Sequence, residues 1–348
     1  MLKAQLFAAC LLTLALFAPP AFAEGEAGIL SLRDQGHFYV GIEVGEPADN
    51  GAIRVYNQMY VGYQLPAEKR QPYPLILVHG GGGQSSDWFS TPDGRDGWRD
   101  YFLAAGFDTY WIDRPGYGRS PTSDTYGELR PGANSQIITF LANARRWPGN
   151  PADHTDPSIL NWLASAPPGP YAGNIVAAAD LSELLDRIGP AILITHSAGA
   201  VSGWWALDQN PDKVAGLIAI EPGASNVAST MRKGLTFEPP LPADFAPVKD
   251  EENCELQPAD NPGQLVRYQD KPIHLVASEM GLIAGLPCAI KAFKQAGVSV
   301  QYTYLPDLGF FGNGHFMMAE TNNGELAQVI IDLATKIAAA NGKNKNDD

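Results

Sequence analysis

The sequence has little cysteine and little positive charge, and each shortage excludes a class of function. Only 3 cysteines occur in 348 residues, without a paired C-x-x-C spacing or an H-E-x-x-H motif, so we expect neither a metal site nor another cofactor. The 24 Lys and Arg residues are outnumbered by 38 Asp and Glu, which gives a net charge of −14. This balance argues against nucleic acid and anionic membranes as partners.

Long apolar runs are also absent beyond the N-terminus, so no later segment is long enough to span a bilayer. Residues 1–23 resemble an export signal, with Lys3 at a positive start, an apolar core over 6–17 and a small-x-small cleavage site at 21–23. An uncleaved anchor is the alternative, but the run is short and two prolines follow it. We expect a mature chain starting near Glu24, periplasmic or secreted, without membrane association after cleavage.

The cysteines that remain after export form an even pair. Cys10 lies inside the signal and is lost on processing, which leaves Cys254 and Cys288. In an oxidising compartment such a pair favours a single disulfide over two buried free thiols.

Apolar runs of strand length alternate with helical patterns along the rest of the chain. The predicted strands are 38–43, 53–63, 75–78, 109–112, 191–194, 216–220, 273–277 and 298–305, and the helices between them include 98–105, 174–187, 284–296 and 325–340. After a first antiparallel pair, strands that are apolar on both faces indicate a mostly parallel sheet with helices on both sides. The loops after the strands then meet at one edge, where ligands of such sheets bind.

Two stretches interrupt this alternation, near 122–171 and 222–268. Both are rich in Pro, Gly, Asn and Asp and are longer than ordinary connectors. We interpret them as insertions that form a cap over the sheet edge, with surface decoration as the alternative. The mature chain, 24–348, is then one domain, and a Cys254–Cys288 bridge would join the cap to its body.

Residues 195–199, Thr-His-Ser-Ala-Gly, are typical of a nucleophile elbow. They follow the apolar run 191–194 and lead into the helix-compatible stretch 200–209, which places Ser197 at a sharp turn from strand to helix. Such a turn exposes the hydroxyl to a histidine base and lets the N–H of Ala198 face a developing oxyanion. Thr195 departs from the usual G-x-S-x-G pattern.

The glycine run 80–83 follows the 75–78 strand, and glycines leave backbone N–H groups open to a substrate oxygen. We expect Gly81 and Ala198 to be the oxyanion donors. A phosphate-binding loop is disfavoured because no Lys-Ser or Lys-Thr follows. His79 is expected to brace this loop.

The base should lie beyond the last strand, because in enzymes with a nucleophile elbow the order along the chain is serine, acid, histidine. His315 fits that place, whereas His37 lies before the sheet, His154 in the first insertion and His274 inside a strand. His196 is expected to point away from its neighbour Ser197 because of the geometry of the turn. Two carboxylates stand at successive strand ends, Glu221 and Glu279. Either could orient the imidazole, and strand placement alone favours Glu279.

Taken together, these features resemble a family of secreted bacterial α/β-hydrolase esterases with a Ser-Glu-His triad and an unusual oxyanion loop. The matching stretches are 78–80, 91–98 with 101–103, 110–120, 196–199, 221–223 and 312–318, and they cover most of the mature chain in order. The resemblance implies the α/β-hydrolase fold and Glu221 as the triad acid. It also leads us to expect two adjacent cysteines in the oxyanion loop, where this chain has Gly81 and Gly82.

Apolar side chains near the predicted site are candidates for lining a substrate pocket. We selected Trp88, Phe316 and Met317, with ordinary core packing as the alternative for each. Asp113, at the end of the 109–112 strand, is expected to organise a turn.

The resulting hypothesis is a serine hydrolase that cleaves a small-molecule carboxylic ester through an acyl-enzyme. An amidase, lactonase or peptidase would use the same groups, and a binding protein that has lost the reaction is a third possibility. The sequence leaves the acyl group, the alcohol group and the oligomeric state open.

Overall fold

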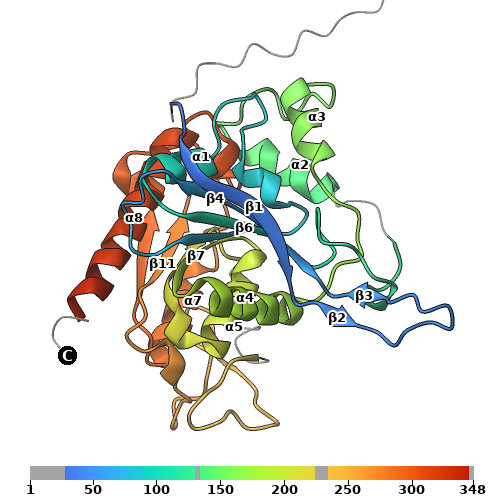
Figure 1. Ribbon diagram of the computed structural model, residues 1–348. Coiled ribbons are helices and arrows are strands. Elements are labelled where there is room, and N and C mark those ends of the chain that lie inside the picture. The colour runs from blue at the N-terminus through green and yellow to red at the C-terminus, as the bar shows by residue number, and fades with distance from the viewer. Residues whose placement is uncertain (1–27, 130–133, 224–233, 345–348) are drawn as a thin grey trace, which may run out of the picture.

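The computed structural model describes residues 28–129, 134–223 and 234–344, which form an eight-stranded sheet with helices on both faces (Figure 1). The strand order is β1-β4-β6-β5-β7-β8-β11-β12. The bounds are β1 Leu32–Val40, β4 Met59–Pro66, β5 Leu75–Val78, β6 Thr109–Asp113, β7 Ala191–His196, β8 Val214–Ile220, β11 Ile273–Ala277 and β12 Val300–Tyr304. The predicted export signal, 1–23, lies outside the described residues.

The sheet is mostly parallel, as predicted. β4 runs antiparallel to β1 and β6, and β6, β5, β7, β8, β11 and β12 are parallel to one another. The carboxyl ends of these six strands therefore meet at one edge, which we call the carboxyl edge. Tyr60 pairs with Asp113, so β4 begins at this same edge.

Alternate residues of the central strands pack on opposite faces. In β5, Leu75 and Leu77 are buried with α1 and α8, whereas Ile76 and Val78 are buried with α4, α5 and α7. The helix bounds are α1 Trp98–Ala104, α4 Asn174–Ile188, α5 Gly199–Gln209, α7 Leu286–Gln295 and α8 Asn323–Asn344. A strand that is apolar at every position needs this double cover, because both of its faces must leave water. Among the described helices, none is long and apolar enough to cross a membrane.

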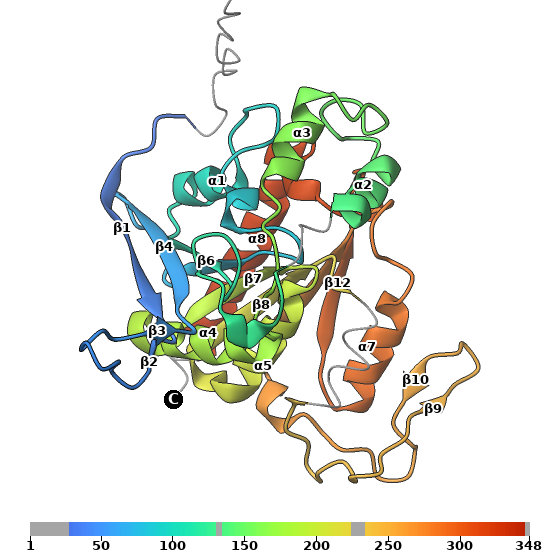
Figure 2. The same cartoon turned by 90° about the vertical axis from the view of Figure 1, so that its right-hand side faces the viewer.

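The predicted strand 53–63 is divided in two. Asn57 adopts a left-handed φ of 59°, which interrupts the extended chain between β3 (Val55–Tyr56) and β4. β3 pairs with β2 (Glu43–Val44) in a separate hairpin that projects from the body (Figures 1 and 2).

The first insertion lies at the carboxyl edge. It contains η2 (Asp124–Tyr126), α2 (Asn134–Asn143) and α3 (Pro157–Ala164), and α2 and α3 lie beside each other in Figure 2. Asn161 donates to Pro92 O at 3.1 Å, and the N–H of Arg145 donates to Gly312 O at 2.8 Å. The insertion is thus fastened to loops that follow β5 and β12.

The described part of the second insertion, 234–268, lies elsewhere. Thr236 bonds Asp208 near the end of α5, and the N–H of Leu265 donates to Ala296 O just beyond α7. Both helices begin at the carboxyl edge and run away from it, so their last turns lie at the opposite edge. The prediction of a cap therefore differs from the structure for residues 234–268, because their polar groups bond to the far ends of α5 and α7.

The predicted disulfide between Cys254 and Cys288 is present. It joins the segment next to β9 (Val248–Lys249) and β10 (Glu255–Leu256) to α7. Lys291, also on α7, donates to Asp250 at 2.8 Å and reinforces this attachment.

The disulfide should contribute to stability through the unfolded chain, because it closes a loop across a sequence separation of 34. We expect the double variant Cys254→Ser, Cys288→Ser to lose about 3 kcal/mol of unfolding free energy, measured by urea denaturation. Reduction should lower the stability of the native chain by a similar amount and leave the double variant unchanged. Equal stabilities with and without the bridge would contradict this expectation.

Candidate active site

Ser197 occupies a tight turn between β7 and α5. Its φ is +49°, a left-handed value that disfavours a non-glycine residue by about 1 kcal/mol. The turn is held because the N–H of Ser197 donates to Ile220 O at 3.0 Å. The structure thus has the sharp strand-to-helix geometry predicted for residues 195–199.

Glycines allow the neighbouring chain segments to approach this turn. A Cβ on Gly199 would lie 2.3 Å from His79 O, and a Cβ on Gly80 would lie 2.7 Å from His196 Nδ1. The departure at Thr195 is accommodated in the same way, because a Cβ on Gly203 would lie 2.7 Å from Thr195 Cγ2. A glycine in α5 therefore provides the space that the first glycine of G-x-S-x-G provides elsewhere.

His315 connects Ser197 with Glu221. Its Nε2 lies 2.9 Å from Ser197 Oγ, and its Nδ1 lies 3.5 Å from Glu221 Oε2. His315 is 2% exposed and Glu221 is 0% exposed, so little water competes for these contacts. The second distance is at the outer limit of a hydrogen bond, as is common in sites without substrate. The three side chains predicted from distant parts of the sequence thus form one continuous series of contacts, from the hydroxyl through the imidazole to the carboxylate.

Glu221 directly follows β8 and also has a left-handed φ, of 48°. Its Oε1 accepts from the N–H of Ser278 at 2.6 Å and from the Ser278 hydroxyl at 2.8 Å, and its Oε2 accepts from the N–H of Leu282. A Cβ on Gly281 would overlap the carboxylate, at 2.1 Å from Oε2. Donors that surround a buried carboxylate compensate for its lost hydration.

Glu279 has a different environment. Its Oε2 accepts from the N–H of Gly312 at 2.7 Å, so it fixes the start of the loop that carries His315. The preference for Glu279 from strand placement therefore does not match the geometry, in which the carboxylate beside the imidazole belongs to Glu221.

His196 also holds this loop, which the sequence did not indicate. We expected its ring to point away from Ser197. Its Nε2 lies 2.8 Å from His315 O and is the donor of this hydrogen bond, because a carbonyl oxygen can only accept. Burial, followed by the charge of His315, holds the pKa of His196 well below its ordinary value, so its ring stays neutral. The position next to the elbow serine was the available signal for this contact.

Aromatic rings from the first insertion and the last loop surround the imidazole. Phe140 of α2 stacks on His315 at a centroid separation of 4.4 Å. Phe316 lies 5.1 Å from His315 and 5.2 Å from Trp162 of α3. Of the residues predicted to line a pocket, Phe316 therefore adjoins the site, whereas Trp88 and Met317 are 0% exposed in the core. The large apolar surfaces of Trp88 and Met317 fill the space between the sheet and its covering helices, so these two side chains pack in the core and do not line a pocket.

The glycine loop lies against the elbow. A Cβ on Gly81 would be 3.4 Å from Ala198 Cβ, so the two predicted oxyanion donors belong to adjacent segments. His79 braces the loop, as expected. Its Nδ1 donates to Gly80 O at 2.8 Å, and its Nε2 accepts from the N–H of Arg114 at 3.0 Å.

Burial and a neighbouring charge keep the His79 ring neutral. Burial and the nearby Arg114 guanidinium lower the pKa of His79 to about 3, so its ring remains neutral and retains one acceptor nitrogen. Arg114 also donates to Gly80 O at 2.7 Å. Asp113 organises the adjoining turn, as predicted, by accepting from the N–H groups of Ser85 and Arg119 at 2.8 and 2.9 Å.

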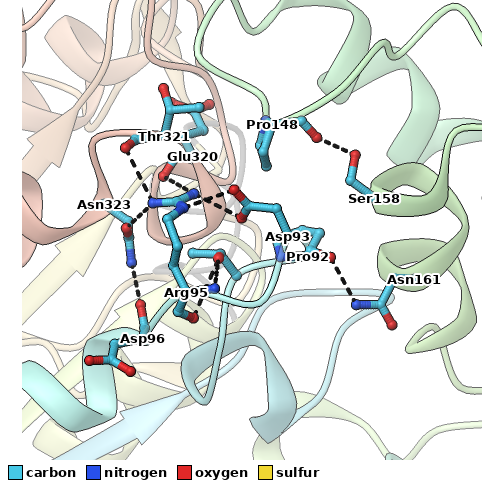
Figure 3. Close-up of polar contacts among 11 residues, drawn as sticks. Pro92, Asp93, Arg95, Asp96, Pro148, Ser158, Asn161, Glu320, Thr321 and Asn323 are labelled. Carbon is cyan, nitrogen blue, oxygen red and sulfur yellow. Dashed lines mark hydrogen bonds and ion pairs between the residues drawn. The ribbon is translucent and has the colours of Figure 1, made fainter. Parts of the chain in front are cut away.

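A second polar network supports the far side of the His315 loop. Glu320 is fully buried, and its carboxylate accepts from the N–H of Gly314 at 2.7 Å and from Asn313 Nδ2 at 2.5 Å. Arg95 fixes the Glu320 segment, since its guanidinium donates to Glu320 O at 3.2 Å and to Asn323 Oδ1 at 2.6 Å (Figure 3). Asp93 in turn holds the Arg95 guanidinium through both of its oxygens. Residues 91–98, which the sequence indicated only as part of the family resemblance, therefore have a structural role in holding the His315 loop.

No metal centre is indicated by the described side chains, since no group of three His, Cys, Asp or Glu among them could hold an ion.

Glu320 should make stability depend on pH. Burial raises its pKa from 4.5 to about 7, so between these values the folded protein keeps a proton that the unfolded chain has lost. Its contribution to stability therefore falls as pH rises through this window. We expect the unfolding free energy of the native chain, relative to Glu320→Gln, to fall by on the order of 3 kcal/mol between about pH 5 and pH 8. The exposed Glu325→Gln is the matched control, and an equal pH dependence in all three proteins would refute the expectation.

Comparisons with known proteins agree with this architecture. The family model described as alpha/beta hydrolase fold matches residues 73–248. A protein named probable secreted lipase phiG, from Fungal sp. (strain ATCC 74256), is 32% identical over an alignment of 321 residues, and the match covers 80% of this chain and 86% of the relative. The solved structure of a novel bacterial esterase has a TM-score of 0.68 and 24% identity, and the match covers 91% of this chain and 99% of that one. The chain is therefore a hydrolase that belongs to the α/β-hydrolase family.

Proposed function

We propose that the protein is a serine carboxylic ester hydrolase, in which Ser197 is the nucleophile, His315 the base and Glu221 the acid. The observation that carries the proposal is the continuous contact from Ser197 Oγ through the imidazole to the buried carboxylate. A serine hydroxyl becomes a strong nucleophile only when a base accepts its proton and a third group orients that base.

In the proposed reaction, His315 Nε2 takes the proton of Ser197 as Oγ attacks the ester carbonyl. The N–H groups of Gly81 and Ala198 donate to the oxyanion, and Glu221 stabilises the imidazolium. The alcohol leaves with the proton from His315, and an acyl-enzyme remains. Water then gives a proton to His315 and attacks the acyl carbon, which releases the acid and restores Ser197.

Three further observations support the type of bond, the compartment and the kind of substrate. The relative named as a probable secreted lipase makes an ester the first choice over an amide, lactone or peptide. The disulfide is the redox state expected of an exported chain, which supports a periplasmic or secreted location. Phe140 and Phe316 beside the imidazole favour an apolar group on the substrate.

Removal of the nucleophile should abolish most of the activity. We expect Ser197→Ala to lower kcat for a soluble p-nitrophenyl ester by at least about a thousandfold, while the fold is retained by circular dichroism. A fluorophosphonate probe should label the native chain and leave the variant unlabelled. Full esterase activity in Ser197→Ala would disprove the mechanism, and a folded native chain that neither reacts nor turns over would indicate a binding protein.

The two carboxylates should differ in their effect. Glu221→Gln leaves the imidazole without its anionic partner, so kcat should fall by roughly a thousandfold or more. Glu279→Gln is the matched control and should cost less than about tenfold, because Glu279 bonds only the Gly312 N–H. Steady-state kinetics of the two variants shows which carboxylate orients the imidazole. A larger loss of kcat in Glu279→Gln than in Glu221→Gln would assign the acid to Glu279.

The bond that is cleaved can be tested with matched substrates. We expect kcat/KM for p-nitrophenyl acetate to exceed that for p-nitroacetanilide by several orders of magnitude, since an amide is the poorer acyl donor. A preference for the amide would make the protein an amidase that uses the same groups.

A further inference from the structure

The β2–β3 hairpin presents an apolar face to solvent. Val44 pairs with Val55 across the hairpin, and the N–H of Gly45 donates to Arg54 O, so the ladder continues toward the tip. Ile42 and Ile53 lie just outside β2 and β3, two residues before Val44 and Val55. The four side chains are 46% to 63% exposed. These four residues, which we call the apolar face of the hairpin, form a candidate contact surface because they are exposed within one short element.

The base of the hairpin is fixed to the body. The N–H of Gly41 donates to Glu183 of α4 at 3.0 Å, and Glu43 accepts from Asn57 at 2.5 Å. Tyr126, in the first insertion, donates to the Asn57 side-chain oxygen at 2.8 Å. The hairpin is thus attached to the same insertion that places Phe140 over His315, and its apolar face has a fixed direction.

The position of this face relates it to the proposed ester site. The hairpin connects β1 to β4 at the carboxyl edge, the edge at which Ser197 lies. Other exposed aliphatic side chains belong to elements at that edge: Leu129 in the first insertion, Leu160 on α3 and Ile175 in the first turn of α4 are 72%, 50% and 53% exposed. At the opposite edge, the β9–β10 segment exposes Val248.

Charge restricts what can cover this surface. The hairpin carries Glu43, Glu46 and Asp49 with Arg54 as its basic residue, and the whole chain has a net charge of −14. An anionic surface would be repelled. A second copy packed on the same face would bring two acidic hairpins together, which is also unfavourable. An uncharged lipid surface combines apolar contact with no such repulsion.

We propose that the apolar face of the β2–β3 hairpin docks the protein on an uncharged lipid surface, so that esters held in that surface reach Ser197. This inference rests on the proposed ester hydrolysis for its substrate, but the docking itself does not. The proposal departs from the expectation of no membrane association after cleavage of the signal, whereas the net charge argues only against anionic surfaces.

The test compares the native chain with a variant that carries Ile42→Ser, Val44→Ser, Ile53→Ser and Val55→Ser. Val248→Ser, on the hairpin at the opposite edge, is the matched control, and all three proteins have the same N-terminus. Binding is measured by flotation with vesicles of phosphatidylcholine alone and with vesicles in which part of the phosphatidylcholine is replaced by the anionic lipid phosphatidylglycerol. Hydrolysis is measured for soluble p-nitrophenyl butyrate and for p-nitrophenyl palmitate dispersed in the vesicles.

We expect the fourfold variant to bind phosphatidylcholine vesicles at least about tenfold more weakly and to lose a similar factor on the dispersed ester. Its kcat/KM for the soluble ester should stay within about twofold, and the control should match the native chain in every assay. Phosphatidylglycerol should weaken binding of the native chain.

Equal vesicle binding by the native chain and the fourfold variant, or none by either, would overturn the docking proposal. A native dimer that the variant converts to a monomer, without vesicle binding, would assign the face to self-association instead. If the native chain binds vesicles but cleaves neither ester, the proposed function fails while the docking surface stands. The two proposals are therefore separable.

Discussion

The left-handed turn at Ser197 is the constraint on which the site depends. A serine at this φ is held only because a strand, a helix and a glycine loop pass within contact distance of it. Gly80, Gly199 and Gly203 make that approach sterically possible. The same turn places Oγ opposite His315 and brings Ala198 beside Gly81, so one backbone conformation positions the proposed nucleophile, base and oxyanion donors together.

Three carboxylates share the task of positioning the imidazole, each through a different contact. Glu221 faces the ring, Glu279 holds the N–H of Gly312, and Glu320 holds the N–H of Gly314. His196 completes the support by donating to the carbonyl of His315. A loop whose successive backbone groups are all bonded retains one conformation, and orientation of a base within a few tenths of an ångström is what acyl transfer requires.

The carboxyl edge combines this polar centre with apolar surroundings. The first insertion covers the imidazole with Phe140, and the hairpin beyond it exposes aliphatic side chains on an otherwise acidic protein. Burial of the triad raises the strength of its electrostatic contacts, while the exposed apolar face offers a route for poorly soluble esters to that edge. The second insertion, bound to the far ends of α5 and α7 and bridged by the disulfide, contributes to the frame instead.

Local patterns determined the fold and the identities of the central groups. Apolar runs such as 75–78 predicted the parallel strands, and the elbow around Ser197 and the histidine after the last strand were visible as short motifs. Residues such as Glu320 and Arg95 were not, because their roles come from bonds to backbone groups that no short motif marks. Glu320 accepts from the N–H of Gly314, and Arg95 donates to Glu320 O, 225 positions along the chain. The same holds for the exposed hairpin, whose residues have the composition of an ordinary strand.

The sequence by itself thus determined which elements form, which cysteines pair and which side chain is the proposed nucleophile, since these depend on neighbours in the chain and on residue chemistry. For the carboxylate, strand placement favoured Glu279 and the family resemblance favoured Glu221, and in the structure it is Glu221 that faces His315. Tertiary structure alone decided that Trp88 and Met317 belong to the core, and that only one insertion lies over the site in the described residues. Those outcomes depend on how loops pack after the sheet has formed. No local pattern encodes that packing, because it is set by contacts such as the one between Glu221 and His315, which lie 94 positions apart.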